Sequence, residues 1–162
     1  MTEYTRAATW TDVKTLVRYL DEQHVEYALV GGYALAAHGF SRFTEDIDIL
    51  VNPSADNSRR WILALSKLPD AAAAELASQG DVFADDKRYA IRINDEFTVD
   101  VMPSIAGLSW DEMKQHIVST QVDDVVVRTL DLPGLLKTKQ GSRPKDQMDA
   151  AVIAAALDRL GD

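Results

Sequence analysis

Two aspartates, Asp46 and Asp48, are separated by one isoleucine in an apolar stretch that runs to Val51. Side chains alternate across a strand, so both carboxylates are expected on one face, while Ile47 and Ile49 face the core. At a rise of about 3.3 Å per residue, the two Cα atoms are roughly 6.6 Å apart. Both carboxylates could then reach one or two cations, and the pattern favours a divalent metal site.

A third aspartate, Asp100, lies in a later apolar stretch with a valine on each side. If the two strands are neighbours, at a spacing of about 4.8 Å, Asp100 completes a group of three carboxylates that would repel one another unless cations bind them. Oxygen ligands without histidine or cysteine favour Mg²⁺ or Mn²⁺. Two ions about 3.5 to 4 Å apart can assist an in-line displacement, with Asp100 accepting the proton of the attacking hydroxyl.

A glycine pair, Gly31 and Gly32, stands between a short apolar stretch and a short helical one. Glycine allows close approach of the backbone, and the N–H groups that open a helix favour an anion. The sequence therefore predicts a triphosphate at the glycines, next to metal ions held by the aspartates.

These elements resemble the signature of the DNA polymerase beta-like nucleotidyltransferase superfamily. Val30-Gly31-Gly32 and Asp46-Ile47-Asp48 match it, with thirteen residues between Gly32 and Asp46, and Asp100 corresponds to the third carboxylate. The resemblance covers residues 27–101. It implies that Asp46 and Asp48 bind both metal ions, that Asp100 binds one ion and the acceptor hydroxyl, and that the glycines bind the triphosphate. Many members carry serine at the position of Gly32.

A looser resemblance links the chain to the AbiEii-type branch, the nucleotidyltransferase toxins of toxin–antitoxin pairs. It rests on residues 42–48, on Lys137 and on residues 143–149. The resemblance implies transfer to an RNA acceptor such as tRNA, an antitoxin partner, and a helical end that steadies phosphates or acceptor. The candidate nucleotide-binding residues beyond the glycines are Arg42, Thr44, Lys137, Arg143 and Lys145. Asp146 and Asp149 are expected to cap and solvate the last helix, and His38 to be packed or on the surface.

Composition narrows the class of protein. The 162 residues carry a net charge of -9, which opposes binding of nucleic acid through a broad basic face. The chain has no cysteine, no signal-like start and no apolar stretch long enough to span a bilayer, so a cytoplasmic protein without membrane contact is expected.

The remaining patterns predict an α/β or α+β fold with a mixed sheet flanked by helices, in a single domain of residues 1–162. Its core is expected over about 25–130 and a C-terminal helical segment over about 131–160. Strands are expected at 27–30, 47–51, 89–93, 97–102, 117–122 and 125–129, the third and fourth forming a hairpin. Helices are expected at 10–24 after a Thr9 or Thr11 cap, 33–38, 54–67, 69–78, 109–116, 132–139 and 144–160.

The function predicted from these features is metal-dependent transfer of a nucleoside monophosphate from an NTP, such as ATP, to a hydroxyl, with release of pyrophosphate. A toxin-like enzyme acting on tRNA is the favoured setting. One alternative is an aminoglycoside or lincosamide nucleotidyltransferase. The acidic chain would suit a polycationic aminoglycoside better than an RNA phosphate backbone. Another is a nucleotide-binding regulatory module without catalysis. The acceptor is not encoded in these motifs.

Overall fold

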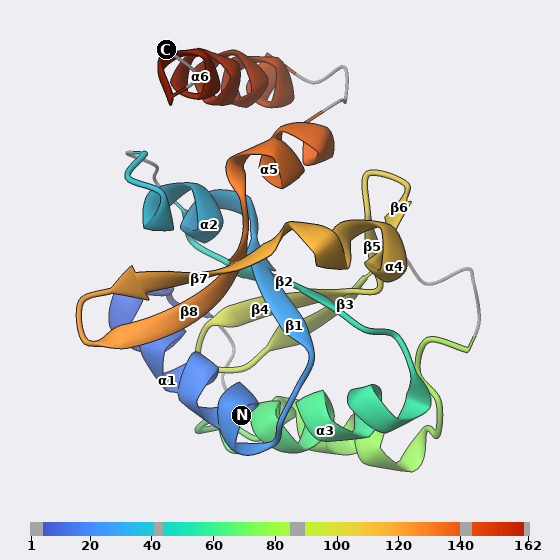
Figure 1. Cartoon of the computed structure of the whole chain (residues 1–162). Helices are drawn as coiled ribbons and strands as arrows, with labels where there is room; N and C mark the ends of the chain where they lie inside the picture. Colours follow the sequence, from blue (N-terminus) through green and yellow to red (C-terminus); the bar gives the residue numbers. More distant parts are fainter. Residues whose placement is uncertain (1–4, 41–43, 85–89, 140–143, 161–162) are drawn as a thin grey trace.

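A computed structural model describes residues 5–40, 44–84, 90–139 and 144–160, which form a six-stranded mixed sheet flanked by helices (Figure 1). The strands of this sheet are β1 (Tyr27–Val30), β2 (Ile47–Val51), β3 (Ile91–Asn94), β4 (Thr98–Met102), β7 (Ile117–Val122) and β8 (Val125–Leu130). The α-helices are α1 (Trp10–Glu22), α2 (Gly31–Ala37), α3 (Ala55–Leu65), α4 (Trp110–Met113), α5 (Leu132–Thr138) and α6 (Pro144–Leu160). The predicted fold class is confirmed.

The strand order of the sheet is β3-β4-β2-β1-β8-β7. The β2–β4 and β1–β8 pairs are parallel, whereas the β1–β2, β3–β4 and β7–β8 pairs are antiparallel. The predicted β3–β4 hairpin is therefore present, and its second strand lies beside β2. A small additional sheet, β5 (Ser104–Ile105) with β6 (Leu108–Ser109), was not expected from the sequence.

The helices form where apolar spacing and caps require them. Thr9 caps α1 in a capping box with Asp12, and the buried face of α1 includes Leu16 and Leu20. Ser54 caps α3, which buries Trp61 completely. In the view of Figure 1, α1 and α3 lie below the sheet, while α2, α5 and α6 lie above it. The apolar strands between these two groups of helices supply much of the core.

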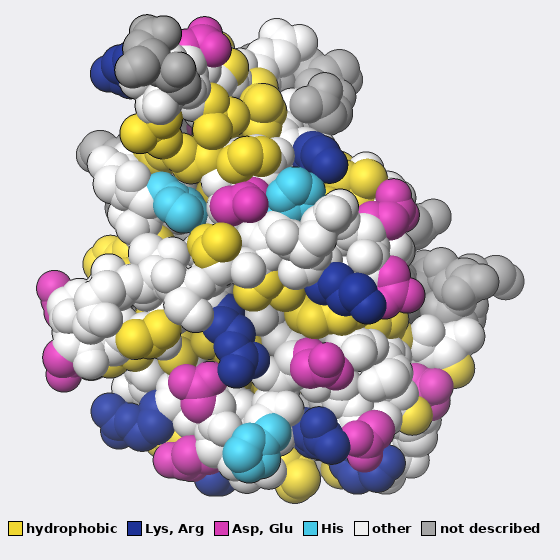
Figure 2. Space-filling view, in the orientation of Figure 1, with side chains coloured by type: hydrophobic (Ala, Val, Ile, Leu, Met, Phe, Trp, Pro, Cys, Tyr) yellow, Lys and Arg dark blue, Asp and Glu magenta, His cyan; other side chains and the backbone are white. Residues whose placement is uncertain are grey.

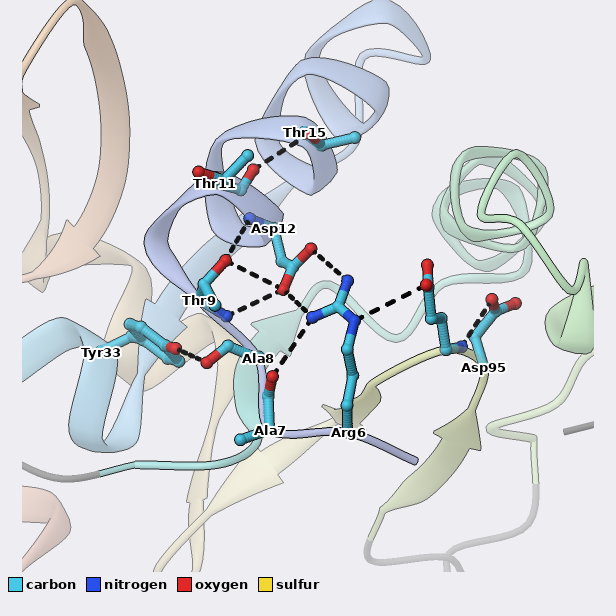
Figure 3. Close-up of polar contacts among 10 residues, drawn as sticks. Arg6, Ala7, Ala8, Thr9, Thr11, Asp12, Thr15, Tyr33 and Asp95 are labelled. Carbon is cyan, nitrogen blue, oxygen red and sulfur yellow. Dashed lines mark hydrogen bonds and ion pairs between the residues drawn. The ribbon is translucent and has the colours of Figure 1, made fainter. Parts of the chain in front are cut away.

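Hydrogen bonds hold the segment that leads into α1 against that helix and against Tyr33 of α2 (Figure 3). Arg6 makes two hydrogen bonds to Asp12, of 2.6 and 2.9 Å, and Tyr33 donates one of 2.6 Å to the Ala8 carbonyl. The Ala8 amide donates to the Glu45 carbonyl at 2.9 Å. The segment before α1 is therefore hydrogen-bonded to Glu45, the residue that precedes Asp46.

Two helices differ from their predictions. The helix expected over 109–116 is an α-helix only in α4 (Trp110–Met113) and continues as a 3₁₀ helix, η2 (Lys114–His116). The alanine-rich segment expected as a helix over 69–78 is a 3₁₀ helix, η1 (Ala72–Ser78). The buried carboxylate of Asp95, in the β3–β4 turn, accepts hydrogen bonds from the amides of Asp70 at 2.8 Å and Ala72 at 3.0 Å. These bonds hold the start of the segment against the hairpin, and the preceding Ala71 adopts a left-handed conformation, with φ of 49°. The left-handed Ala71 therefore interrupts the α-helix that alanine propensity predicted over 69–78.

The C-terminal helices pack on each other, α6 against α5. Helix α6 buries Ile153 but leaves Met148, Val152 and Leu160 exposed. Hydrophobic side chains are visible over this part of the surface in Figure 2. Among the described residues, no helix has both the length and the apolar character that crossing a bilayer requires.

Candidate active site

The strand register aligns two of the three candidate carboxylates, Asp48 and Asp100, in one row. Asp48 on β2 is the register partner of Asp100 on parallel β4, and it also faces Val30 on antiparallel β1. Asp100 is in turn the partner of Arg92 on β3. Directly opposed residues project from the same face of a sheet, so Asp48, Asp100 and Arg92 share a face. The expectation that the strands of Asp48 and Asp100 are neighbours is confirmed.

The glycine pair lies against the aspartate motif. Gly31 follows Val30 directly and has a positive φ of 69°, and a Cβ at this position would overlap Asp48 Oδ2. A Cβ on Gly32 would lie 2.8 Å from Thr44 Cβ, and the Thr44 hydroxyl donates to the Asp46 carbonyl at 3.1 Å. The backbone that opens α2 is thus in contact with the loop and strand that carry the carboxylates, and any larger side chain would disturb both.

Asp48 is the most perturbed acid of the group. Burial raises its pKa to about 7, and the charge of Asp100 and a hydrogen bond with Asp100 add to the increase. The charge of Asp46 contributes further, while that of Lys139 opposes it. Close carboxylates that cannot all ionise freely are a feature of functional sites, where a cation or a proton completes the charge balance.

The sequence did not identify Arg92 as a site residue. Its Nε and Nη2 atoms donate to the two oxygens of Asp100 at 3.0 and 3.1 Å, and Nη2 also lies 3.5 Å from Asp46 Oδ2. The predicted hairpin contained the signal, because an arginine and an aspartate face each other across it. The register of the hairpin was needed to find the pair.

The helical end approaches the site through Lys139. Its Nζ lies 3.2 Å from Asp149 Oδ2, and both side chains are largely buried. The expectation that Asp149 would be solvated on the last helix is wrong, because the residue is 4% exposed and belongs to this ion pair between α6 and the end of α5. Lys137, two residues earlier, is exposed.

The other candidate residues are only partly described. Arg42 and Arg143 lie outside the described residues, and Lys145 belongs to α6 with its side chain outside them. His38 is half-buried, with Nε2 at 2.8 Å from the Leu130 carbonyl, which agrees with its expected packed position.

The donors in the row are suited to a hard cation, as carboxylate oxygens are the ligands that Mg²⁺ and Mn²⁺ prefer. The register of β2 and β4 places two such ligands, Asp48 and Asp100, side by side. In the part of the chain that the structure describes, however, no three acidic or histidine side chains converge closely enough to hold an ion. The donor types therefore fit a divalent metal, while the positions of the side chains require an adjustment.

Solved structures with this fold include nucleotidyltransferase-like proteins. The chain is similar to a candidate nucleotidyltransferase of Thermotoga maritima, with a TM-score of 0.59 and 11% identity over 93% of this chain and 91% of that one. It is also similar to an antigenic nucleotidyltransferase-like protein of Paracoccidioides brasiliensis, with a TM-score of 0.52 and 17% identity over 92% of this chain and 78% of that one. At these identities the likeness shows the fold, which is that of nucleotidyltransferases.

The family follows from the sequence itself. The family model described as the nucleotidyl transferase AbiEii toxin of a type IV toxin–antitoxin system matches residues 14–156. The chain belongs to this family, and the resemblance to the AbiEii-type branch is confirmed. The match includes the glycine pair, the row of carboxylates and the Lys139–Asp149 pair. No curated protein matches the chain.

Proposed function

We propose that the protein transfers a nucleoside monophosphate from an NTP to a hydroxyl group of an acceptor and releases pyrophosphate. The observation that carries the proposal is the register that places Asp48 and Asp100 side by side, next to Gly31. Membership of a nucleotidyltransferase family supports the same class of reaction.

The proposed order of the substrates follows the order of Gly31, Asp48 and Asp100 in the structure. With the triphosphate at Gly31 and Gly32, the α-phosphate lies toward Asp48 and Asp100, and the acceptor enters from the side of Asp100. The acceptor oxygen attacks the α-phosphorus, a new P–O bond forms, and the bond to the bridging oxygen of the β-phosphate breaks. Pyrophosphate leaves with that electron pair, and Asp100 accepts the proton of the hydroxyl.

Asp46, Asp48 and Asp100 are the residues that would hold Mg²⁺ or Mn²⁺. Two bound ions would neutralise charge on the phosphates and on the attacking and leaving oxygens. Asp48 would have to lose the proton that its raised pKa favours. Thr44 supports this arrangement through its bond to the Asp46 carbonyl.

Basic residues outside the row are proposed to bind the nucleotide or the acceptor. Lys139 is the basic residue of the helical end that influences Asp48 electrostatically. The other proposed ligands from the sequence are Arg42, Lys137, Arg143 and Lys145. Membership of a toxin–antitoxin family supports an antitoxin partner. A tRNA acceptor and a cytoplasmic location are further parts of the proposal.

Transfer of label tests the proposal and identifies the acceptor. The protein is incubated with Mg²⁺ and each α-labelled NTP, with total tRNA, aminoglycosides and lincosamides offered in parallel. Asp48→Asn is expected to abolish transfer, while Asp56→Asn, which changes an exposed carboxylate on α3, keeps it.

The acceptor that receives the label distinguishes the alternative functions. Label on tRNA supports the toxin-like setting, and label on an antibiotic supports the resistance enzyme. Undiminished transfer by Asp48→Asn contradicts the assignment of the site. Nucleotide binding without transfer to any acceptor, and without pyrophosphate release, supports the regulatory module.

A further inference from the structure

Arg92 supplies a positive charge inside the group of carboxylates. It binds both oxygens of Asp100, at 3.0 and 3.1 Å, and lies 3.5 Å from Asp46 Oδ2. A two-point contact of this kind fixes the orientation of the carboxylate as well as its charge. Arginine keeps its charge at every relevant pH, and the contact with Asp100 raises the pKa of Arg92 further.

This contact occupies carboxylate oxygens that a metal ion would need. Both Asp100 oxygens are directed toward a guanidinium on β3, at the edge of the sheet, and Asp46 is drawn to the same group. A metal ion shared by Asp48 and Asp100 would need at least one of these oxygens. The guanidinium and a metal ion would therefore compete for the same carboxylate oxygens.

Arg92 can leave without refolding of the protein. Its side chain is 60% exposed, whereas that of Asp100 is 15% exposed. Rotation of an exposed arginine at a sheet edge toward solvent breaks no contact in the core. Because the pair is accessible to water on the arginine side, its strength is modest and a divalent ion can overcome it.

We propose that Arg92 is a resident counter-cation of the carboxylate site, which holds Asp100 and Asp46 in the metal-free protein and is displaced when a divalent metal binds. Arg92 acts through these two carboxylates and is a positioning residue. The inference rests on the proposed function, since it requires the metal to bind at the same aspartates. It predicts that Arg92 weakens metal binding in the absence of nucleotide.

The test measures Mn²⁺ affinity of the metal-free full chain by electron paramagnetic resonance, without nucleotide. Arg92→Gln is expected to bind Mn²⁺ about three- to tenfold more tightly than the wild type, which corresponds to loss of a modest, partly exposed ion pair. Arg92→Lys keeps the charge without the two-point geometry and should fall between the two. Arg60→Gln is the matched control, because Arg60 forms an exposed pair with Asp56 on α3 and its loss changes net charge equally.

The outcomes separate this inference from the proposed function. Unchanged or weaker Mn²⁺ binding by folded Arg92→Gln overturns the role of Arg92, and so does an equal gain in Arg60→Gln, which would indicate a general effect of net charge. The Asp48→Asn substitution is then made both in the wild-type protein and in the Arg92→Gln variant. If Asp48→Asn leaves Mn²⁺ binding unaltered in both backgrounds, the metal does not lie at this site, and the proposed function fails together with the inference.

Discussion

Asp48 and Asp100 occupy one register position on neighbouring parallel strands, and burial together with the nearby charge of Asp100 raises the pKa of Asp48 to about 7. The protein thus folds around an acidic pair that is not fully compensated by its own side chains. Such an arrangement costs stability and is retained where charge is needed for chemistry.

The first prediction concerns pH. The folded protein keeps a proton on Asp48 that the unfolded chain releases above about 3.8, the ordinary value. The contribution of Asp48 to the free energy of unfolding is therefore fully present below pH 3.8 and is lost as pH rises through about 7. We expect a loss of about 1 to 3 kcal/mol that is absent in Asp48→Asn. Urea unfolding of both proteins from pH 4 to pH 8, without divalent metal, measures the difference. A difference that does not change with pH would contradict the assignment.

The second prediction concerns metal binding. Because the ion competes with the proton on Asp48, Mg²⁺ affinity of the wild type should rise as pH increases toward about 7 and then level off. Binding should also release protons below that pH. Titration calorimetry in two buffers of different ionisation enthalpy counts these protons. Asp56→Asn should behave as the wild type, and equal affinity at pH 5.5 and pH 8 would disprove the competition.

The third prediction concerns Gly31. Alanine at this position must adopt a positive φ and also places a Cβ against Asp48 Oδ2. Gly80→Ala is a matched control, because Gly80 has a φ of 73° and open space around the added Cβ. We expect Gly80→Ala to cost about 1 kcal/mol, and Gly31→Ala to cost about 2 kcal/mol more and to lose transfer. Thermal unfolding and labelled transfer measure both effects. Equal stability of the two variants would show that the close contact is unimportant.

The fourth prediction separates two lysines of the helical end. Lys139→Ala removes the ion-pair partner of buried Asp149 and should cost about 2 to 4 kcal/mol, with a loss of transfer. Lys137→Ala changes an exposed residue and should cost less than about 0.5 kcal/mol. Chemical denaturation and the transfer assay, run at a temperature where both variants are folded, compare them. A larger loss of stability in Lys137→Ala than in Lys139→Ala would contradict the structural role given to Lys139.

The fifth prediction concerns acid stability at the start of α1. Hydrogen bonds from Arg6 hold the pKa of Asp12 below its ordinary value of 3.8, so this contribution is present above 3.8 and is lost as pH falls through the lowered pKa. Since Arg6 is 44% exposed, we expect Arg6→Gln to cost only about 1 kcal/mol at pH 7. The cost should diminish in acid. Denaturation at pH 7 and pH 2.5 tests this, and an equal cost at both values would exclude the ion pair as its source.

Much of the fold could be predicted because local patterns and local structure agree. The strand at 47–51 and the Thr9 cap are confirmed, since apolar alternation and capping act over a few residues. The start of η1 was mispredicted because Ala71 is left-handed and because the Ala72 amide donates to Asp95, which lies 23 residues further along the chain. Propensity has no information about such a distant hydrogen bond.

The sequence by itself determined the types and spacing of the chemical groups: the glycine pair, Asp46 and Asp48, and Asp100 in its apolar flank. Only the tertiary structure decided which of these side chains share a surface and with what neighbours. Register joined Asp48, Asp100 and Arg92 in one row, and helix packing buried Asp149 against Lys139. The reason is physical, because burial and the interaction of charges depend on distances through space, which separation along the chain does not specify.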